Sequence, residues 1–296
     1  MRAIVFHAHG GPEVLALAEL PDPVAGPGRT GRVRVDRRPA AESSPTAPPL
    51  VSLGGMTPTL ASWGGQLRPL SARRSVVVYE ARGQGLSELD VSDVGPARHV
   101  DDFAALLLAL DLPGPVDLCG FSFGGRIALA IAAQRPELVR RLVITGVSAG
   151  RGALGRVIVR AWQAALATGD LETLAWLSLA DTLGPAYLDR NEALLPAFVK
   201  ATVERNTFAG VHALFTQTLH DTPTWPFHPT ALAPRITCPV LLLAGEHDRL
   251  APAADLGALA AGFAGPATHR VIPGVGHTAA IEAPELWRAA VLEFLS

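Results

Sequence analysis

Short apolar runs alternate with helical patterns along much of the chain. Residues 50–53, 75–79, 116–119 and 142–145 form such runs, and stretches with apolar residues at helical spacing follow several of them. Strands that are buried on both faces of a parallel sheet are apolar throughout, because helices cover both sides. The alternation therefore predicts an α/β fold with a mostly parallel central sheet and helices on both faces.

The alternation is interrupted once, between residues 149 and 234. Helical patterns dominate there, with large aromatic residues spaced through them. The strand pattern resumes at residues 239–244, and the chain closes with an amphipathic helix expected over residues 284–295. We therefore predict a core built from residues 48–148 and 235–296, with the intervening stretch inserted as a helical cap.

Residues 1–47 have a different character. Turns rich in proline and glycine surround short strand patterns such as residues 31–35, and the stretch predicts an amino-terminal hairpin and linker segment. Its opening, with Met1 to Val5 and Gly10 to Leu15, resembles the amino terminus of medium-chain, quinone-oxidoreductase-like dehydrogenases over residues 1–36. No Gly-rich strand-to-helix fingerprint for a dinucleotide follows, so we expect no nicotinamide cofactor.

Composition narrows the classes of partner. The formal net charge is -2 and no long run of like charge occurs, so we expect neither nucleic acid nor a membrane surface as a partner. The cysteines, Cys119 and Cys238, lie in apolar runs, which indicates neither a disulfide framework nor a zinc site. No apolar run reaches the ~18 residues of a membrane helix and no targeting segment is recognised, so a cytoplasmic location is expected.

The motif Gly120-x-Ser122-x-Gly124 lies where an apolar run meets a helical pattern. A sharp strand-to-helix turn lifts a serine hydroxyl clear of the sheet, and glycines on either side let the backbones approach without a Cβ clash. The turn also places the serine at a helix N-terminus, where N–H groups favour negative charge on an attacked carbonyl. The motif therefore predicts Ser122 as a nucleophile, although a Gly-Ser-Gly loop without chemistry is the alternative.

A serine nucleophile needs a base, and the base needs a group that holds its tautomer. His277 lies in a Gly-rich loop after the last apolar run, which makes it the best base candidate among the nine histidines. Asp248 follows the apolar run that ends at Ala244, at the carboxyl end of a predicted strand, where a carboxylate orients an imidazole. Glu246 is the competing carboxylate.

Residues 48–296 resemble the α/β-hydrolase fold superfamily, and the order Ser, Asp, His along the chain is the order of that family. The resemblance implies that Ser122 is the nucleophile, Asp248 the acid and His277 the base. It also implies that the backbone N–H groups of Phe123 and Met56 bind the oxyanion. Further matching positions are Gly54, Gly55, Trp63, residues 82–85 with Ser87, Asp102, Pro252 and Gly276.

Two positions depart from the pattern of the resembling family. Gly54 stands where relatives commonly have a histidine that organises the oxyanion loop by hydrogen bonding. We therefore expect a less rigid loop, with its backbone donors still present. Gln84 also stands where histidine is frequent, and we interpret it as a local structural variation.

The predicted cap supplies candidates for an acyl site. Trp162 and Trp176 are interpreted as substrate-binding, together with Gly55 and Arg126. The stretch 120–126 resembles the elbow of menaquinone-pathway lyases of the same superfamily, while an ion pair on the helix is the alternative role of Arg126.

The expected function is hydrolysis of a carboxylic ester or thioester of a small, largely apolar acyl substrate, through an acyl-enzyme and without a metal or organic cofactor. A lyase or cyclase that uses the same residues is one alternative, and a catalytically silent binding protein on this scaffold is another. Resemblance of fold does not choose between the first two.

Overall fold

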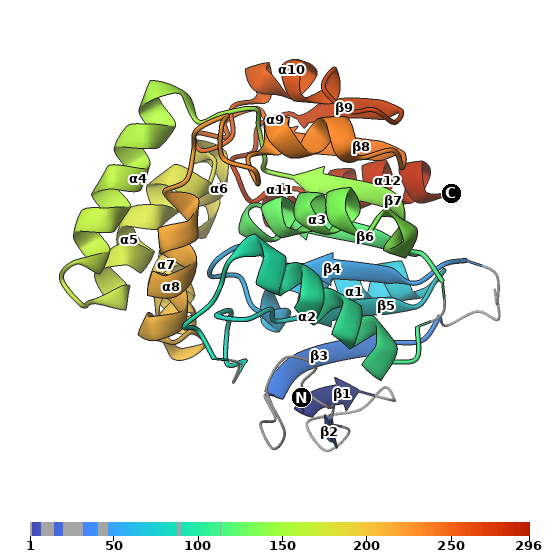
Figure 1. Cartoon of the computed structure of the whole chain (residues 1–296). Coiled ribbons are helices and arrows are strands. Elements are labelled where there is room, and N and C mark those ends of the chain that lie inside the picture. The colour runs from blue at the N-terminus through green and yellow to red at the C-terminus, as the bar shows by residue number, and fades with distance from the viewer. Residues whose placement is uncertain (1, 7–14, 20–31, 41–46, 88–89, 113) are drawn as a thin grey trace.

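Nine strands form one sheet in the part of the chain that the structure describes. The structure is a computed structural model that describes residues 2–6, 15–19, 32–40, 47–87, 90–112 and 114–296. Across the sheet the strands follow the order β2-β1-β3-β5-β4-β6-β7-β8-β9 (Figure 1). Their bounds are β1 Arg2–Phe6, β2 Leu15–Glu19, β3 Arg32–Arg38, β4 Leu50–Leu53, β5 Val76–Tyr79, β6 Val116–Phe121, β7 Val139–Thr145, β8 Val240–Gly245 and β9 Ala267–Ile272.

Within the run β5-β4-β6-β7-β8-β9, each strand is parallel to the next. Every residue of β4, β5 and β8 is buried. Such strands tolerate few polar side chains, because helices cover both faces of the sheet. The predicted α/β fold with a mostly parallel central sheet is therefore confirmed.

Helices pack on both faces of the sheet (Figure 1). On one face α2, α3 and α10 share a buried cluster with Val51 and Val77, and on the other α1 and α12 pack on Leu50 and Val76. Neighbouring residues of one strand belong to different clusters because successive side chains point to opposite faces. The helix bounds are α1 Gly64–Ser71, α2 Pro96–Ala109, α3 Phe123–Gln134, α4 Gly152–Leu166, α5 Leu171–Thr182, α6 Pro185–Asn191, α7 Leu195–Glu204, α8 Phe208–Thr218, α9 Pro229–Leu232, α10 Leu256–Ala260, α11 Ala279–Glu282 and α12 Pro284–Leu295.

Helices α4 to α8 lie together at one side of the sheet, away from α1, α2 and α12 (Figure 1). They come from the stretch that the sequence predicts as an inserted cap. Helices α4, α5 and α8 share a buried cluster of their own, which includes Ile158, Trp162, Leu174 and Phe215. In the described ranges, no helix is long and apolar enough to cross a membrane.

The amino-terminal segment contributes strands to the same sheet. β1 pairs antiparallel with β2, as an edge hairpin does, and parallel with β3. β3 pairs antiparallel with β5, and its Val33 and Val35 are buried in the cluster that contains α2 and α3. Residues 32–38 are therefore part of the core, although the sequence interpretation assigned them to the segment before it. The predicted turns at residues 21–23 and 27–28 lie outside the described residues.

A buried carboxylate joins the sheet to the end of the chain. Asp117, at the start of β6, accepts hydrogen bonds from Arg74 at 2.5 Å and from two nitrogens of Arg140 at 2.8 and 2.6 Å. Arg74 also donates to the carbonyl of Leu295 in α12. The Asp117 side chain is fully buried, so its charge depends on these two guanidinium groups.

Replacing this carboxylate tests how much of the stability depends on it. We expect Asp117→Ala to lower the free energy of unfolding by about 3 kcal/mol, because it leaves two partly buried arginines without their counter-charge. The matched control is Asp101→Ala on the exposed side of α2, which we expect to change it by less than about 0.5 kcal/mol. Urea unfolding followed by circular dichroism measures both, and equal stabilities of the two variants would refute the assigned role of Asp117.

Candidate active site

The carboxyl ends of β4 and β6 lie side by side in the sheet. From β4 the chain passes to β5 on one side, and from β5 it returns to β6 on the other side. In open parallel sheets such a reversal leaves a crevice at the carboxyl ends of the strands, where ligands bind. Residues after β4, from Gly54 to Met56, and residues after β6, from Ser122 onward, meet at this crevice.

Ser122 occupies a strained turn between β6 and α3. Its φ is 52° and its ψ is -115°, a backbone conformation that residues other than glycine rarely adopt. A Cβ on Gly120 would lie 2.6 Å from the carbonyl oxygen of Gly124, and a Cβ on Gly124 would lie 2.3 Å from the carbonyl oxygen of Gly54. The two glycines of the motif are therefore required by close backbone contacts.

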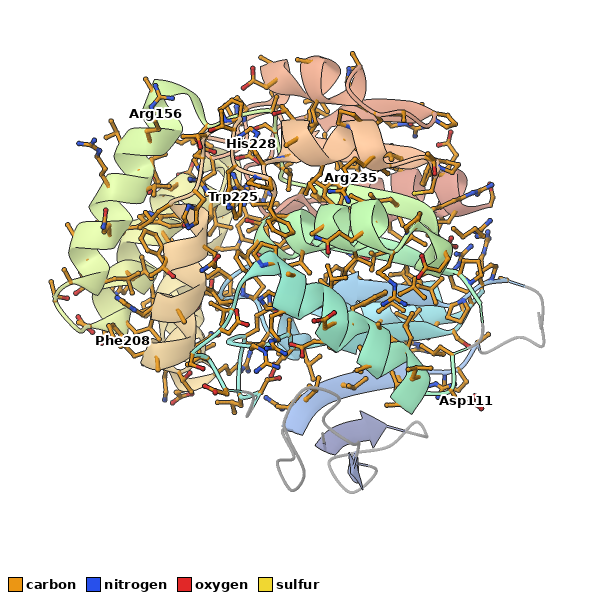
Figure 2. The ribbon with its side chains drawn as sticks, viewed as in Figure 1. Asp111, Arg156, Phe208, Trp225, His228 and Arg235 are labelled. Carbon is orange, nitrogen blue, oxygen red and sulfur yellow. The ribbon has the colours of Figure 1, made fainter. Side chains whose placement is uncertain are left out.

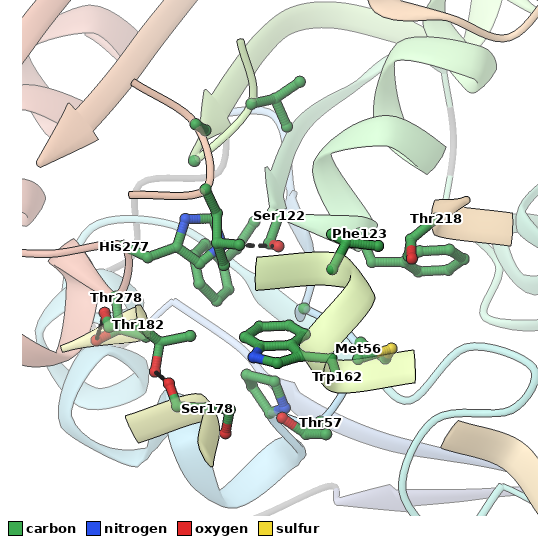
Figure 3. A pocket seen from close by; sticks show the side chains of 18 of the residues that line it. Met56, Thr57, Ser122, Phe123, Trp162, Ser178, Thr182, Thr218, His277 and Thr278 are labelled. Carbon is green, nitrogen blue, oxygen red and sulfur yellow. Dashed lines mark hydrogen bonds between the residues drawn. The ribbon is translucent and has the colours of Figure 1, made fainter. Parts of the chain in front are cut away.

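Three predicted side chains form one hydrogen-bonded chain. The hydroxyl of Ser122 lies 2.8 Å from Nε2 of His277 (Figure 3). On the other side of the ring, Nδ1 of His277 lies 2.7 Å from Oδ2 of Asp248. A carboxylate only accepts, so Nδ1 carries the hydrogen and Nε2 accepts the serine proton. His277 is 155 positions from Ser122 and 29 positions from Asp248 in sequence. The fold thus brings the three side chains together with the imidazole between the hydroxyl and the carboxylate, as nucleophilic attack by the serine requires.

The carboxylate of this chain is fixed on its other oxygen. Oδ1 of Asp248 accepts hydrogen bonds from the backbone N–H groups of Leu250 and Ala251, at 2.9 and 2.8 Å. Glu246, the competing carboxylate, instead accepts from the N–H of Gly274 and does not contact His277. The structure therefore brings Asp248, and not Glu246, to the imidazole.

A second buried carboxylate holds the loop that carries His277. Glu282 accepts hydrogen bonds from the N–H of Gly276 at 3.0 Å, the N–H of Gly184 at 2.7 Å and the hydroxyl of Thr278 at 2.9 Å. Gly184 follows α5, so this one side chain joins the histidine loop to the end of α5. The sequence interpretation missed Glu282, because its partners are set by the fold and not by a local motif.

An open cavity lies over Ser122 and His277 (Figure 3). Its walls come from the loops after β4, β6 and β7 and from helices α4 and α5. Three of the predicted substrate-binding residues, Gly55, Arg126 and Trp162, line it. Trp162 is also fixed by a hydrogen bond from its Nε1 to Asp181.

The prediction for Trp176 is wrong. The residues of α5 that line the cavity are Leu171, Leu174, Ala175, Ser178 and Thr182, which share one helical face. Trp176 lies off this face, and its side chain is 43% exposed on the outside of the cap. The sequence pattern did not reveal this, because apolar residues of α5 occur on more than one side.

Two backbone donors at the cavity have no protein acceptor among the described residues. These are the N–H of Phe123, the first residue of α3, and the N–H of Met56 in the loop after β4. Both residues line the cavity beside Ser122. Unpaired N–H groups at a helix N-terminus attract negative charge, so the pair is available to an oxyanion.

The loop that contains Met56 is held by Gln84. Nε2 of Gln84 donates to the carbonyls of Gly54 at 2.9 Å and Gly55 at 2.7 Å, and its Oε1 accepts from the N–H of Ala81. A side chain at position 54 would meet the carbonyl of Pro58 at 2.8 Å. Gln84 therefore supplies hydrogen bonds that anchor the loop where the sequence interpretation expected less rigidity. In the described ranges, no group of three His, Cys, Asp or Glu side chains is placed to hold a metal ion.

Comparisons with known proteins show the family of the chain. Residues 50–290 match the family model described as "Alpha/beta hydrolase family". A Caulobacter sp. (strain K31) protein named "Putative carbamate hydrolase RutD" is 31% identical over 240 residues, which cover 79% of this chain and 85% of that protein. A pyrrolizixenacetamide deacetylase of Xenorhabdus hominickii is 26% identical over 246 residues, with the same coverage.

The fold is also seen in solved structures. A thermophilic esterase from Thermogutta terrifontis superposes with a TM-score of 0.77 at 22% identity, covering 92% of this chain and 95% of the esterase.

Removal of the Gln84 amide tests its role in the loop. We expect Gln84→Ala to raise the hydrogen exchange rate of the backbone amides at residues 54–58 by about tenfold, since each buried hydrogen bond contributes about 1 kcal/mol. Exchange measured by mass spectrometry reports this directly. Gln163→Ala, at an exposed position of α4, is the control, and an unchanged rate in Gln84→Ala would show that the loop is held by other contacts.

Proposed function

The chain belongs to the α/β hydrolase family, and on this premise we propose that it is a serine hydrolase that cleaves a carboxylic ester or thioester of a small, largely apolar acyl substrate. In this proposal Ser122 is the nucleophile, His277 the general base and Asp248 the acid that orients the imidazole. The reaction proceeds through an acyl-enzyme and requires water as the only other reactant.

The observation that carries the proposal is the hydrogen-bonded chain at the floor of the cavity. The distances of 2.8 Å from Ser122 to His277 and 2.7 Å from His277 to Asp248 are those of direct proton transfer partners. A serine hydroxyl is a poor nucleophile alone, and a neutral imidazole within hydrogen-bond distance activates it. The cavity places this hydroxyl within reach of a small molecule.

In the first half of the reaction, Oγ of Ser122 attacks the carbonyl carbon while its proton passes to Nε2 of His277. The carbonyl oxygen becomes an oxyanion, which the N–H groups of Phe123 and Met56 stabilise. One such donor is worth about 3 kcal/mol of transition-state energy in comparable enzymes. The charge on the imidazolium is balanced by Asp248, whose second oxygen is already bound by two backbone N–H groups.

The oxyanion then collapses, the bond to the alcohol or thiol breaks, and His277 returns its proton to the leaving group. The acyl group is now an ester of Ser122. In the second half His277 takes a proton from water, the hydroxide attacks the acyl carbon, and a second collapse releases the carboxylic acid and restores the serine hydroxyl.

The walls of the cavity support an acyl chain as the bound group. Apolar side chains of the cap, Val159, Trp162, Leu171 and Leu174, line it opposite Ser122. Burial of an apolar chain against them contributes about 25 cal/mol of binding free energy for each Å² of apolar surface removed from water. The two relatives named as a carbamate hydrolase and a deacetylase make a carbamate and an amide useful further substrates in the assay.

Replacement of the nucleophile gives the primary test. We expect wild-type protein to hydrolyse short and medium p-nitrophenyl esters or acyl thioesters, and we expect Ser122→Ala to lower kcat by at least about 10⁴-fold. Ser92→Ala, in an exposed turn, is the matched control and should keep the wild-type rate. Activity of Ser122→Ala close to the wild-type value would overturn the assignment of the nucleophile.

Covalent labelling separates an active site from a silent one. A fluorophosphonate should label wild-type protein at Ser122 and should not label Ser122→Ala, because the reagent requires an activated hydroxyl. Absence of labelling in the wild-type protein would favour a silent binding protein. Labelling without turnover of any ester or thioester would reject the proposed substrate class and leave the amide, the carbamate and the lyase alternatives.

A further inference from the structure

One charged side chain in the cavity has no ion-pair partner among the described residues. Arg151, immediately before α4, lines the cavity and donates one N–H, from Nη1, to the carbonyl of Thr218. No carboxylate of the described chain lies within 4.0 Å of its guanidinium nitrogens. The other N–H groups of the Arg151 guanidinium are available to bind a ligand.

The position of Arg151 is costly for a cation. Burial, and then the neighbouring charge of Arg126, lower the pKa of Arg151 to about 10, although the more weakly acting charge of Asp221 raises it, so the group still carries its charge near neutral pH. Withdrawal of a charge from water without a counter-charge is unfavourable. A bound anion would remove this cost.

The carboxylate of Asp221, which lies near Arg151, is already paired with Arg126. Oδ1 of Asp221 lies 3.3 Å from Nη2 of Arg126, which also donates to the carbonyl of His220 at 3.2 Å. Nε2 of His228 lies 3.9 Å from the same oxygen, and burial lowers the pKa of His228, which keeps its ring neutral. Arg126 and Asp221 therefore balance each other, and the charge of Arg151 remains.

The rest of the lining does not compensate for this charge. Among the described residues that line the cavity are Arg126 and Arg151, and no aspartate or glutamate. A cavity with low-dielectric walls and a net positive charge concentrates anions. The apolar wall formed by Val159, Leu171 and Leu174 belongs to the same cavity, so one ligand can contact both.

We propose that Arg151, with Arg126 beside it, binds a carboxylate at the end of the acyl chain, so that the preferred substrate is a half-ester or half-thioester of a short dicarboxylic acid. This inference rests on the proposed function and specifies its substrate. A planar guanidinium binds a carboxylate through two parallel hydrogen bonds, which fixes the orientation of the chain. Ser122, Arg126 and Arg151 line the same cavity, so one short acyl chain can extend from the serine to the guanidinium groups.

A matched pair of esters tests the proposal. Mono-p-nitrophenyl adipate and p-nitrophenyl hexanoate have acyl chains of equal length and differ in the terminal carboxylate. We expect wild-type protein to prefer the adipate ester in kcat/KM, and Arg151→Gln to lower this preference by about 10- to 100-fold, mainly through the KM of the adipate ester. Arg151→Lys, which keeps the charge, should restore part of the preference.

The control is Arg156→Gln, at an exposed position of α4 (Figure 2), which should leave the ratio of the two esters unchanged. Equal kcat/KM values for the two esters in wild-type protein would overturn the proposal. So would an unchanged ratio in Arg151→Gln, because Arg151 would then only anchor the end of α8.

A binding measurement keeps this inference separate from the proposed function. Calorimetry with adipate and with hexanoate should show tighter binding of adipate to the wild-type protein, and loss of that difference in Arg151→Gln. If no ester is hydrolysed but this difference is found, the reaction class is wrong and the carboxylate site stands. Equal binding of adipate and hexanoate to the wild-type protein would reject the site. This result needs no variant, so it stands even if Arg151→Gln does not fold.

Discussion

At the turn that carries Ser122, the backbone of Gly120 lies against that of Gly124, and the backbone of Gly124 lies against that of Gly54. Both contacts are closer than a Cβ atom permits. The N–H of Gly124 donates to the carbonyl of Gly54 at 3.1 Å, so the elbow and the loop after β4 are bonded directly. The positive φ of Ser122 costs on the order of 1–3 kcal/mol, which the surrounding packing must offset. Helix α3, which is buried along nearly its whole length, provides this packing and fixes the direction in which the hydroxyl points.

Buried polar side chains tie the loops of the site to each other and to the cap. Gln84 holds the loop after β4, and Glu282 joins the histidine loop to the cap at Gly184. Asn206, after α7, accepts from the N–H of Gly85 and donates to the carbonyl of Thr57. Each of these buried bonds is expensive to leave unmade, so movement of the cap disturbs the loops that carry the donors and the base.

The sequence predicted the features that depend on local pattern. The strand at Leu50–Leu53 and the helix at Pro284–Leu295 have the predicted bounds. Burial on both faces leaves an unbroken apolar run in a strand, and burial on one face leaves a helical period in a helix. Ser122, Asp248 and His277 were identifiable because a motif and a chain order mark them. In the structure their side chains are hydrogen-bonded in the predicted order. Their roles in the reaction are part of the proposed function.

Features set by long-range contacts were not predictable in the same way. Gln84 meets carbonyls 29 and 30 residues away, and Glu282 meets an N–H 98 residues away. Arg151 has no motif, and its importance comes from the lack of an ion-pair partner in the described cavity. Trp176 was misplaced because apolar residues on several sides of α5 do not indicate which side faces inward.

In the proposed mechanism, the strained elbow presents Ser122 to a carbonyl whose oxygen is bound by two backbone donors. A crystal structure of the protein after reaction with an alkyl phosphonate ester measures this directly, because the adduct imitates the tetrahedral intermediate. We expect a bond from phosphorus to Oγ of Ser122, with the phosphoryl oxygen about 2.7–3.1 Å from the nitrogens of Phe123 and Met56. An adduct on another residue, or a phosphoryl oxygen that points away from both nitrogens, would contradict it.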